Sequence, residues 1–276
     1  MRELSEEWLA MFEEALSVAQ TVADKDIPAS YDLLFDGDTP NAERAIILSR
    51  MQENIPHGVM IAELDIPAQN WLETVYEALP PLVIGRYVVH GTHVEPALES
   101  GQERLVIVAA TAFGTGQHST TWGCLMAFQD LLDAGVKPAN CADIGTGSGI
   151  LALAAHGTLK CPTLATDNDP ESTRLTSIHA GMNNAGADFE VHLAEGVDNH
   201  IRGKGPFDVV FANILAGPLK ELAPDLAAIT ANDGHLILSG LLETQAEDVL
   251  AAYKEQGMKL LATRTRDGWA ALTLSR

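Results

Sequence analysis

The sequence has few cysteines, few basic residues and no long apolar runs. Its three cysteines, Cys124, Cys141 and Cys161, are an odd number at wide spacing, so neither a disulfide framework nor a cysteine-based metal site is indicated. The longest apolar runs, such as LILSGLL, are far shorter than the roughly 20 residues of a membrane span. The opening MRELSEEW lacks the basic and apolar regions of a signal peptide. We therefore expect a cytoplasmic protein that uses neither a membrane nor a metal.

The shortage of basic residues also limits the partners. The chain holds 17 Lys and Arg against 38 Asp and Glu, a formal net charge of −21. Residues 1–95 alone hold five basic and 17 acidic side chains. Binding to nucleic-acid phosphates requires a concentration of basic side chains, so no direct nucleic-acid partner is expected. An acidic surface favours a basic protein partner instead.

The patterning predicts two domains, a small one over residues 1–95 and a larger one over 104–276. The first combines short helical and extended patterns, beginning with a helix predicted over 5–22, and this mixture is typical of a small α+β domain. The polar segment 96–103, which contains Pro96 and Gly101, is predicted to link the two domains.

From Arg104 onward, apolar strands alternate with helical patterns. Strands are predicted at 104–110, 141–145, 163–169, 189–196, 207–214, 234–241, 259–268 and 269–275. Helices are predicted at 120–134, 149–157, 170–186, 218–230 and 243–257. This order predicts an α/β fold with a doubly wound parallel sheet that ends in an antiparallel edge. Ligands of such sheets bind at the carboxyl ends of the strands.

A glycine turn, DIGTGSG, follows the first central strand. Its glycines, Gly145, Gly147 and Gly149, depart from the dinucleotide pattern G-x-G-x-x-G because the third falls one residue early. This spacing weakens a nicotinamide or flavin interpretation. Asp143, two residues before the first glycine, suits a ligand whose ammonium group needs a carboxylate. A tight strand-to-helix packing turn is the alternative interpretation.

Polar side chains also lie at the ends of two later strands. Asp167 lies 22 residues after Gly145, at the spacing of an acidic residue that accepts hydrogen bonds from both ribose hydroxyls of an adenosine. Asn213 ends the strand FDVVFAN, where its amide can hold an amine in line with an electrophilic carbon. A turn-forming role is the alternative for Asn213.

Together these segments resemble the successive motifs of class I S-adenosylmethionine-dependent methyltransferases. The stretches DIGTGSGILALAA, ATDNDP and FANILAGPLKELAPDL are most similar to those of the PrmA family, which methylates the eleventh protein of the large ribosomal subunit. The earlier stretch AFGTGQHSTT resembles that family's own FGTG-x-H-x-TT loop. The likeness extends from about Arg86 to the end of the sequence, including DGWAALTL.

The resemblance implies a Rossmann-like methyltransferase domain with S-adenosylmethionine as its cofactor. It also implies that the two glycine clusters contact opposite sides of that cofactor. The implied cofactor-contacting residues are Phe113, Gly114, Thr115, Gly116, His118, Thr121, Asp143, Gly145, Gly147, Asp167 and Asn213. For His118, a hydrogen bond that orders the loop is the alternative role.

The implied activity is methyl transfer to amines of a basic ribosomal protein, on lysine side chains and/or the N-terminus. A sulfonium makes its methyl group electrophilic, so the reaction needs alignment and a neutral amine more than a strong base. We therefore expect Asn213 to be the catalytic residue that positions the amine. No general base is indicated. We expect the chain to act as a monomer.

The N-terminal region departs from the family, whose recognition domain is a ferredoxin-like βαββαβ unit. The sequence starts directly with a predicted helix, and the turn DGDTPN leaves little room for the third strand. The expected domain is thus a diverged ferredoxin-like unit. Two alternatives follow: a methyltransferase acting on another protein or a small amine, and a non-catalytic module that binds the cofactor.

Overall fold

The computed structural model describes residues 17–21, 30–34, 49, 80–108 and 118–276. Contacts along the chain divide it into two compact units, Met1–Asn70 and Trp71–Arg276. Each unit is described by itself below.

In the first unit, the described residues form one antiparallel pair of strands. These are β1 (Ser17–Thr21) and β2 (Ser30–Leu34), in a register that places Val18 opposite Leu33. The end of the helix predicted over 5–22 is therefore a strand. Its β-branched residues suit extended backbone better than a helix. Residues 31–34, where the sequence predicts an extended segment at YDLLF, lie in β2 as expected. Apart from Ser49, which is helical, the remaining elements expected before residue 80 lie outside the described residues.

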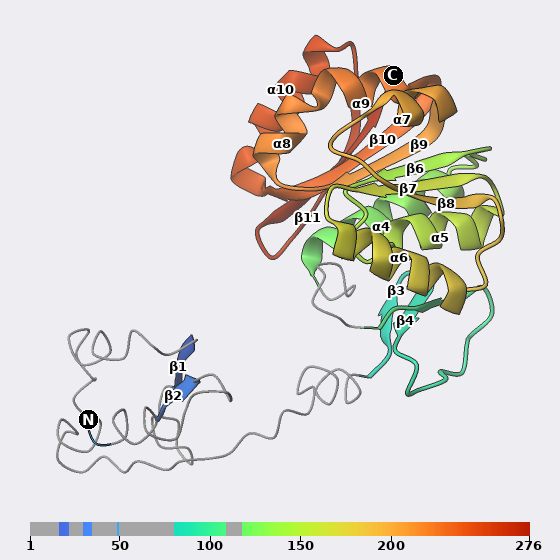
Figure 1. Ribbon diagram of the computed structural model, residues 1–276. Helices are drawn as coiled ribbons and strands as arrows, with labels where there is room; N and C mark the ends of the chain where they lie inside the picture. Colours follow the sequence, from blue (N-terminus) through green and yellow to red (C-terminus); the bar gives the residue numbers. More distant parts are fainter. Residues whose placement is uncertain (1–16, 22–29, 35–48, 50–79, 109–117) are drawn as a thin grey trace. The chain divides into compact units, whose positions relative to one another are not determined.

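The second unit is built around a seven-stranded sheet (Figure 1). Its strands are β6 (Cys141–Ile144), β7 (Thr163–Asp167), β8 (Phe189–Leu193), β9 (Phe207–Asn213), β10 (Thr230–Leu242), β11 (Lys259–Arg266) and β12 (Trp269–Ser275). They lie in the order β11-β12-β10-β9-β6-β7-β8. Strands β6 to β10 pair in parallel, and β12 is antiparallel to both of its neighbours. The predicted doubly wound sheet with an antiparallel C-terminal part is confirmed.

The strand order fixes where a ligand can bind. The chain runs outward from β6 to β7 and β8, then returns to place β9 on the other side of β6. Such a reversal opens a crevice at the carboxyl ends of the two central strands. One detail differs from chain order: the last strand, β12, inserts between β10 and β11.

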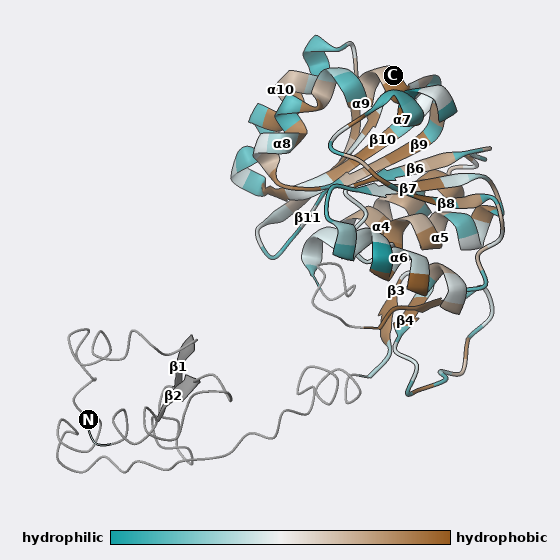
Figure 2. Cartoon of the chain, in the orientation of Figure 1, coloured by the Kyte–Doolittle hydropathy of each residue, from teal (hydrophilic) through white to brown (hydrophobic). Residues whose placement is uncertain are grey.

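Helices cover both faces of this sheet (Figure 1). On one face lie α4 (Ser119–Asp133), α5 (Ile150–Leu159) and α6 (Pro170–Met182). On the other lie α7 (Asn199–Lys204), α8 (Ala216–Glu221), α9 (Ala223–Ile229) and α10 (Ala246–Glu255). The central strands are mostly hydrophobic, and polar residues gather on the outer sides of the helices (Figure 2). This distribution is expected for a parallel sheet buried on both faces.

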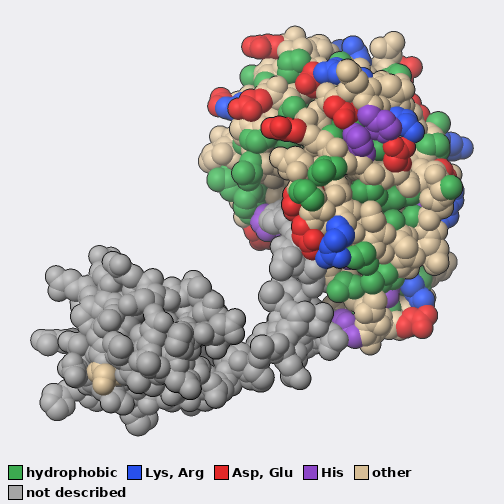
Figure 3. Space-filling view, viewed as in Figure 1, with side chains coloured by type: hydrophobic (Ala, Val, Ile, Leu, Met, Phe, Trp, Pro, Cys, Tyr) green, Lys and Arg blue, Asp and Glu red, His purple; other side chains and the backbone are tan. Residues whose placement is uncertain are grey.

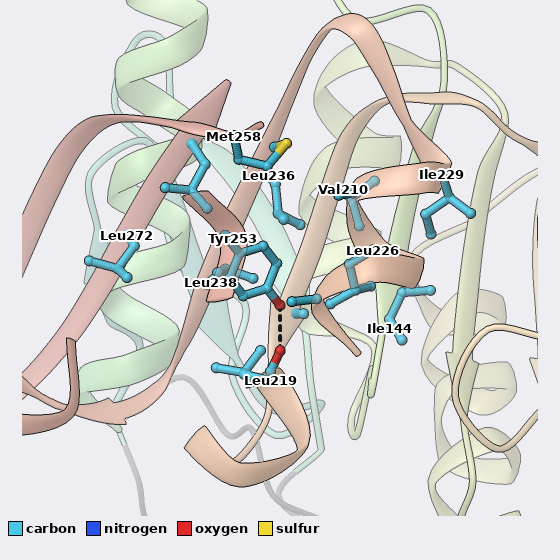
Figure 4. Close-up of a cluster of buried hydrophobic side chains, with 14 of the residues drawn as sticks. Ile144, Val210, Leu219, Leu226, Ile229, Leu236, Leu238, Tyr253, Met258 and Leu272 are labelled. Carbon is cyan, nitrogen blue, oxygen red and sulfur yellow. Dashed lines mark hydrogen bonds between the residues drawn. The ribbon is translucent and has the colours of Figure 1, made fainter. Parts of the chain in front are cut away.

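One hydrophobic core fills the space between the sheet and the helices α7 to α10 (Figure 4). Tyr253 of α10 is fully buried there, among Leu236 and Leu238 of β10 and Leu226 of α9. Its hydroxyl donates a 2.8 Å hydrogen bond to the carbonyl oxygen of Leu219. A buried phenol needs such a partner, and the bond joins α10 to α8.

The second core joins the other face of the sheet to a separate three-stranded sheet. That sheet consists of β3 (Leu82–Ile84), β4 (Tyr87–His90) and β5 (Glu103–Val106), in which β4 and β5 run parallel. Its apolar residues pack with those of α4 and α5 in one cluster. The contact division at Asn70 and Trp71 thus differs from the predicted boundary at 95, because β3 pairs with β4, and β4 pairs with β5, which begins at the end of the predicted linker.

Two further details differ from the predicted elements. The helix predicted over 218–230 is two helices, α8 and α9, that meet at Leu222. Pro224 explains the break, because it has no N–H to donate to the carbonyl of the residue four positions earlier. The short helix α7 was not predicted; Asp198 caps it by accepting a 2.9 Å hydrogen bond from the N–H of Ile201.

Within the described part of the chain, none of the helices is long and apolar enough to cross a membrane. The same residues contain no group of three or more His, Cys, Asp or Glu arranged to hold a metal ion.

Candidate functional site

The glycine turn lies at the carboxyl end of the central strand β6, and its backbone requires glycine. Gly145, Gly147 and Gly149 all have positive φ, at 77°, 56° and 84°. A Cβ at Gly145 would lie 2.3 Å from Cγ2 of Ile214, in the segment that follows β9. Only glycine meets both demands, so the turn can pass close to the end of the neighbouring strand.

Asp143 is buried beneath this turn. One carboxylate oxygen, Oδ2, accepts a 2.6 Å hydrogen bond from the Thr146 hydroxyl and a 3.2 Å bond from the N–H of Ala152. The other oxygen, Oδ1, is buried and has no hydrogen-bond partner among the described residues. Burial raises the pKa of Asp143 from its usual range to about 7. An unpaired, buried carboxylate oxygen is costly unless a ligand completes it.

Asp167 ends β7 beside the same turn. Its Oδ2 accepts a 2.8 Å hydrogen bond from the N–H of Gly147, and its Oδ1 accepts a 3.0 Å bond from the N–H of Asp169. The backbone therefore holds the carboxylate in place, while each oxygen keeps a second lone pair. Asp169 caps α6, as expected, by accepting hydrogen bonds from the N–H groups of Glu171 and Ser172.

Asn213 is the last residue of β9, on the other side of the switch point. Its Oδ1 is buried without a hydrogen-bond partner in the described structure. The backbone after it is held close to β10, since a Cβ at Gly240 would lie 2.2 Å from the carbonyl oxygen of Ile214. Gly240, with φ 86°, thus determines where the segment after Asn213 lies.

The start of α4 contributes the next side chains. His118 caps this helix: its Nδ1 accepts a hydrogen bond from the N–H of Thr120. Its ring packs edge-on against Trp269, with 4.7 Å between the centroids. Thr121 is fully buried, and its hydroxyl oxygen lacks a hydrogen-bond partner in residues 80–108 and 118–276. The cap supports the alternative role of His118, a hydrogen bond that orders the loop.

The structure therefore brings the predicted residues that it describes to one edge of the sheet. They come from four elements: α4, β6 with its turn, β7 and β9. Three of them, Thr121, Asp143 and Asn213, carry a buried polar atom without a partner among the described residues. Phe113, Gly114, Thr115 and Gly116 lie outside those residues.

Two surface cavities lie elsewhere. One, of about 320 Å³, is lined by Arg202, Asn232 and Arg276 near the amino ends of β9 and β10. The other, of about 460 Å³, lies between β5 and α5. Neither contains an unpartnered buried polar atom within the described chain. The switch-point edge is the stronger candidate, because three of the six buried side-chain atoms without a partner in the described residues gather there.

Sequence patterns missed two residues that hold the glycine turn from α6. The Thr176 hydroxyl donates a 2.9 Å hydrogen bond to the carbonyl of Gly147, and His179 lies 2.7 Å from the carbonyl of Ser148. They are three residues apart and therefore share one face of the helix. That spacing is the available sequence signal, but it does not say which backbone groups the face meets.

The chain is similar to known proteins over nearly its whole length. The profile of the family described as Ribosomal protein L11 methyltransferase (PrmA) matches residues 4–276. A protein of that name from Rhodopseudomonas palustris (strain BisB5) is 38% identical over 241 residues, covering 87% of this chain and 81% of the relative. Another, from Mesorhizobium japonicum, is 36% identical over 273 residues, covering 96% of this chain and 91% of the relative.

A solved structure agrees with these relatives. The crystal structure of a ribosomal protein L11 methylase from Lactobacillus delbrueckii subsp. bulgaricus superposes with a TM-score of 0.61 at 31% identity. The superposition covers 70% of this chain and 95% of that one. The strand order and the glycine turn fit the methyltransferase fold that the sequence predicts. Because the family profile and these relatives match nearly the whole length, the chain belongs to the ribosomal protein L11 methyltransferase (PrmA) family.

Proposed function

We propose that this protein is an S-adenosylmethionine-dependent methyltransferase that modifies ribosomal protein L11. Membership of the family supports the reaction class. The single observation that carries the proposal is the convergence of buried polar atoms without partners, from Thr121, Asp143 and Asn213, at the switch point of the described sheet. Most buried polar atoms in folded proteins are paired, so three unpaired ones at one edge of the sheet favour a ligand site there.

The residues at the switch point fit the chemistry of the cofactor. Asp143 offers a buried carboxylate oxygen to the ammonium of a methionine moiety. Asp167 is held so that both of its oxygens can accept from vicinal ribose hydroxyls. The glycine turn lets the backbone approach the ligand closely. When bound, S-adenosylmethionine supplies a methyl group that its sulfonium makes electrophilic.

Asn213 would align the accepting amine. A lysine amine with a pKa near 10.4 is mostly protonated at neutral pH, so the site has to favour its neutral form. Removal from water does this, because it disfavours the charged form. The unpaired Oδ1 of Asn213 is an acceptor that would orient the amine through its N–H group. No side chain is assigned as a general base.

The proposed acceptors are lysine side chains and/or the N-terminal amine of the substrate. The excess of acidic residues in 1–95 supports attraction of a basic protein. In the second unit, acidic and basic side chains are interspersed over the face that Figure 3 draws. We therefore place substrate attraction in the N-terminal residues, and propose that the protein acts in the cytoplasm as a monomer without contacting nucleic acid directly.

Intact-mass spectrometry of ribosomal protein L11 tests the reaction and the substrate together. The protein is taken from cells with the gene, from cells without it, and from deleted cells that carry Asn213→Ala. We expect methyl increments only in the first sample. An unchanged mass after deletion would exclude this substrate and favour the alternative, another protein or a small amine. Tritium transfer from labelled cofactor to other cellular proteins would then identify it.

A further inference from the structure

His179 of α6 connects two backbone segments that are far apart in the sequence. Its side chain is buried, with 1% exposure. Its Nδ1 lies 2.7 Å from the carbonyl oxygen of Ser148 in the glycine turn. Its Nε2 accepts a 3.2 Å hydrogen bond from the N–H of Val108, which lies just beyond β5. One imidazole thus joins the turn after β6 to the edge of the three-stranded sheet.

These two contacts require one particular form of the ring. The Ser148 carbonyl can only accept, so Nδ1 must carry a proton. The Val108 N–H can only donate, so Nε2 must be unprotonated. A neutral imidazole with its proton on Nδ1 satisfies both groups, and an imidazolium does not. Burial lowers the pKa of His179 and thereby favours the neutral ring.

The surrounding contacts give this link a defined position. Thr176, one turn earlier on α6, holds the carbonyl of Gly147. Asn183, one turn later, accepts from the N–H of Val106 at 2.9 Å and donates to the carbonyl of Val106 at 2.8 Å. Two side chains of α6 and the residue that caps its C-terminal end therefore fasten the glycine turn on one side and the region of β5 on the other. His179 alone of the three contacts both.

We propose that His179 is a positioning residue for the cofactor: by holding the Ser148 carbonyl, it sets the backbone of the turn that carries Gly145 and Gly147. This inference rests on the proposed function. Both of its ring nitrogens contact backbone groups, those of Ser148 and Val108. It acts through the turn, whose N–H at Gly147 in turn holds the carboxylate of Asp167.

Two substitutions separate the two contacts of the ring. The amide nitrogen of asparagine falls near the position of Nδ1, so His179→Asn keeps a donor for Ser148 and loses the bond to Val108. Glutamine reaches the position of Nε2, so His179→Gln keeps an acceptor for Val108 and loses the bond to Ser148. The readout is the dissociation constant of S-adenosylhomocysteine, measured by calorimetry on the folded full-length protein.

We expect His179→Gln to weaken the binding of S-adenosylhomocysteine about tenfold, and His179→Asn to stay within about twofold of the parent protein. His156 provides the matched control. It is also buried; its Nδ1 lies 3.1 Å from the carbonyl of Cys161, and its Nε2 accepts from the N–H of Gly186. His156→Asn and His156→Gln should lower the melting temperature without changing the dissociation constant.

Three outcomes would overturn the inference. If His179→Gln binds S-adenosylhomocysteine as tightly as the parent protein, or if both His179 variants lose the same affinity, His179 serves packing and does not position the turn. A parent protein that does not bind S-adenosylhomocysteine would instead overturn the proposed function itself. Nitrogen chemical shifts of His179 in the unaltered protein provide a test that does not depend on any variant folding. They should report a neutral ring protonated on Nδ1, and an imidazolium would contradict the proposal.

Discussion

The two ends of the central sheet differ in how their buried polar side chains are hydrogen-bonded. At the carboxyl end, Thr121, Asp143 and Asn213 each carry a buried oxygen without a partner in the described residues. At the amino end, the polar side chains mostly serve the backbone. Asp208 accepts a 2.7 Å hydrogen bond from the N–H of Ala139, and Asn140 accepts from the N–H of Asp208 at 2.8 Å.

The amino end is also closed by the C-terminal residue. The guanidinium of Arg276 donates 2.9 Å hydrogen bonds to the carbonyls of Ala227 and Thr230 at the end of α9. Within the described structure, His235 Nδ1 is the one buried side-chain atom near this end without a partner. The difference teaches that the amino edge satisfies most of its buried polar groups within the chain, with His235 as the exception among the described residues. The carboxyl edge keeps three buried oxygens without partners in the described residues, and we propose that the cofactor and the accepting amine complete them.

Asn213→Ala should give the largest effect and would sharpen this contrast most. We expect kcat to fall about 100-fold, because a small misplacement of a reacting group carries a cost of that order. The dissociation constant of S-adenosylhomocysteine should change little, since the amide is proposed to hold the accepting amine. Steady-state kinetics and calorimetry measure the two quantities. Equal losses in both would refute the role of Asn213 in positioning the amine.

Gly240→Ala tests whether the carboxyl end depends on close backbone contact. The new Cβ would meet the carbonyl oxygen of Ile214 at 2.2 Å, on backbone with φ 86°. Gly257 is the matched control, because it has φ 82° but nothing within 4 Å of its Cβ position. We expect Gly257→Ala to lower the free energy of unfolding by about 1 kcal/mol and Gly240→Ala to cost about 2 kcal/mol more. Denaturant unfolding measures both, and equal costs would contradict the contact.

Asp143 should make cofactor affinity depend on pH. Its pKa is raised to about 7, mainly by burial. The carboxylate that attracts an ammonium therefore forms only as the pH rises through that value. S-adenosylhomocysteine should bind about tenfold more tightly at about pH 8 than at about pH 6, and Asp143→Asn should remove this dependence. A parent protein with the same affinity at both pH values would argue against an ammonium contact.

The raised pKa of Asp143 also makes the free energy of unfolding depend on pH. Between about pH 4, where an unfolded aspartate titrates, and about pH 7, the folded state of the ligand-free protein holds a proton that the unfolded state has lost. Stability from this group therefore falls as the pH rises through that window. Asp143→Asn should flatten the fall in a series of denaturant unfolding curves, and an unchanged slope would contradict the burial of the carboxylate.

Asn140→Ala should give the smallest effect, confined to stability. The substitution removes the bonds to Asp208 and to the carbonyl of Pro206. We expect a loss of about 1 kcal/mol in the free energy of unfolding. Activity and cofactor affinity should match the parent protein when measured well below the melting temperature. A drop in kcat at Asn140 would remove the functional difference between the two ends.

Much of the fold could be predicted from the sequence, because its signals are local. Alternating strands and helices predicted the parallel sheet, and its carboxyl ends placed Asp143, Asp167 and Asn213 at one edge. Their assigned roles in binding and catalysis remain predictions. The proline at position 224 also contained the signal for the break between α8 and α9, although the continuous apolar pattern around it favoured one helix.

The remaining features depend on contacts between segments distant in sequence. His179 meets Val108 across 71 residues, and Gly240 meets the backbone of Ile214. No periodicity encodes such pairs. The domain boundary predicted at 95 stays a prediction, and it bears on a contact of the same kind, since β5 pairs with β4 across a polar segment whose composition is typical of a linker. Arg104 and Glu95 of that region form an ion pair.

The reactivity of the three cysteines can report local opening of the structure. All are free and buried; Cys141 and Cys161 lie at the amino ends of neighbouring strands with their sulfurs 4.0 Å apart. Cys124 lies on α4, one turn after Thr121. A thiol-labelling reagent can reach them only when the chain opens, and the order in which the three react would report which end of the sheet opens first.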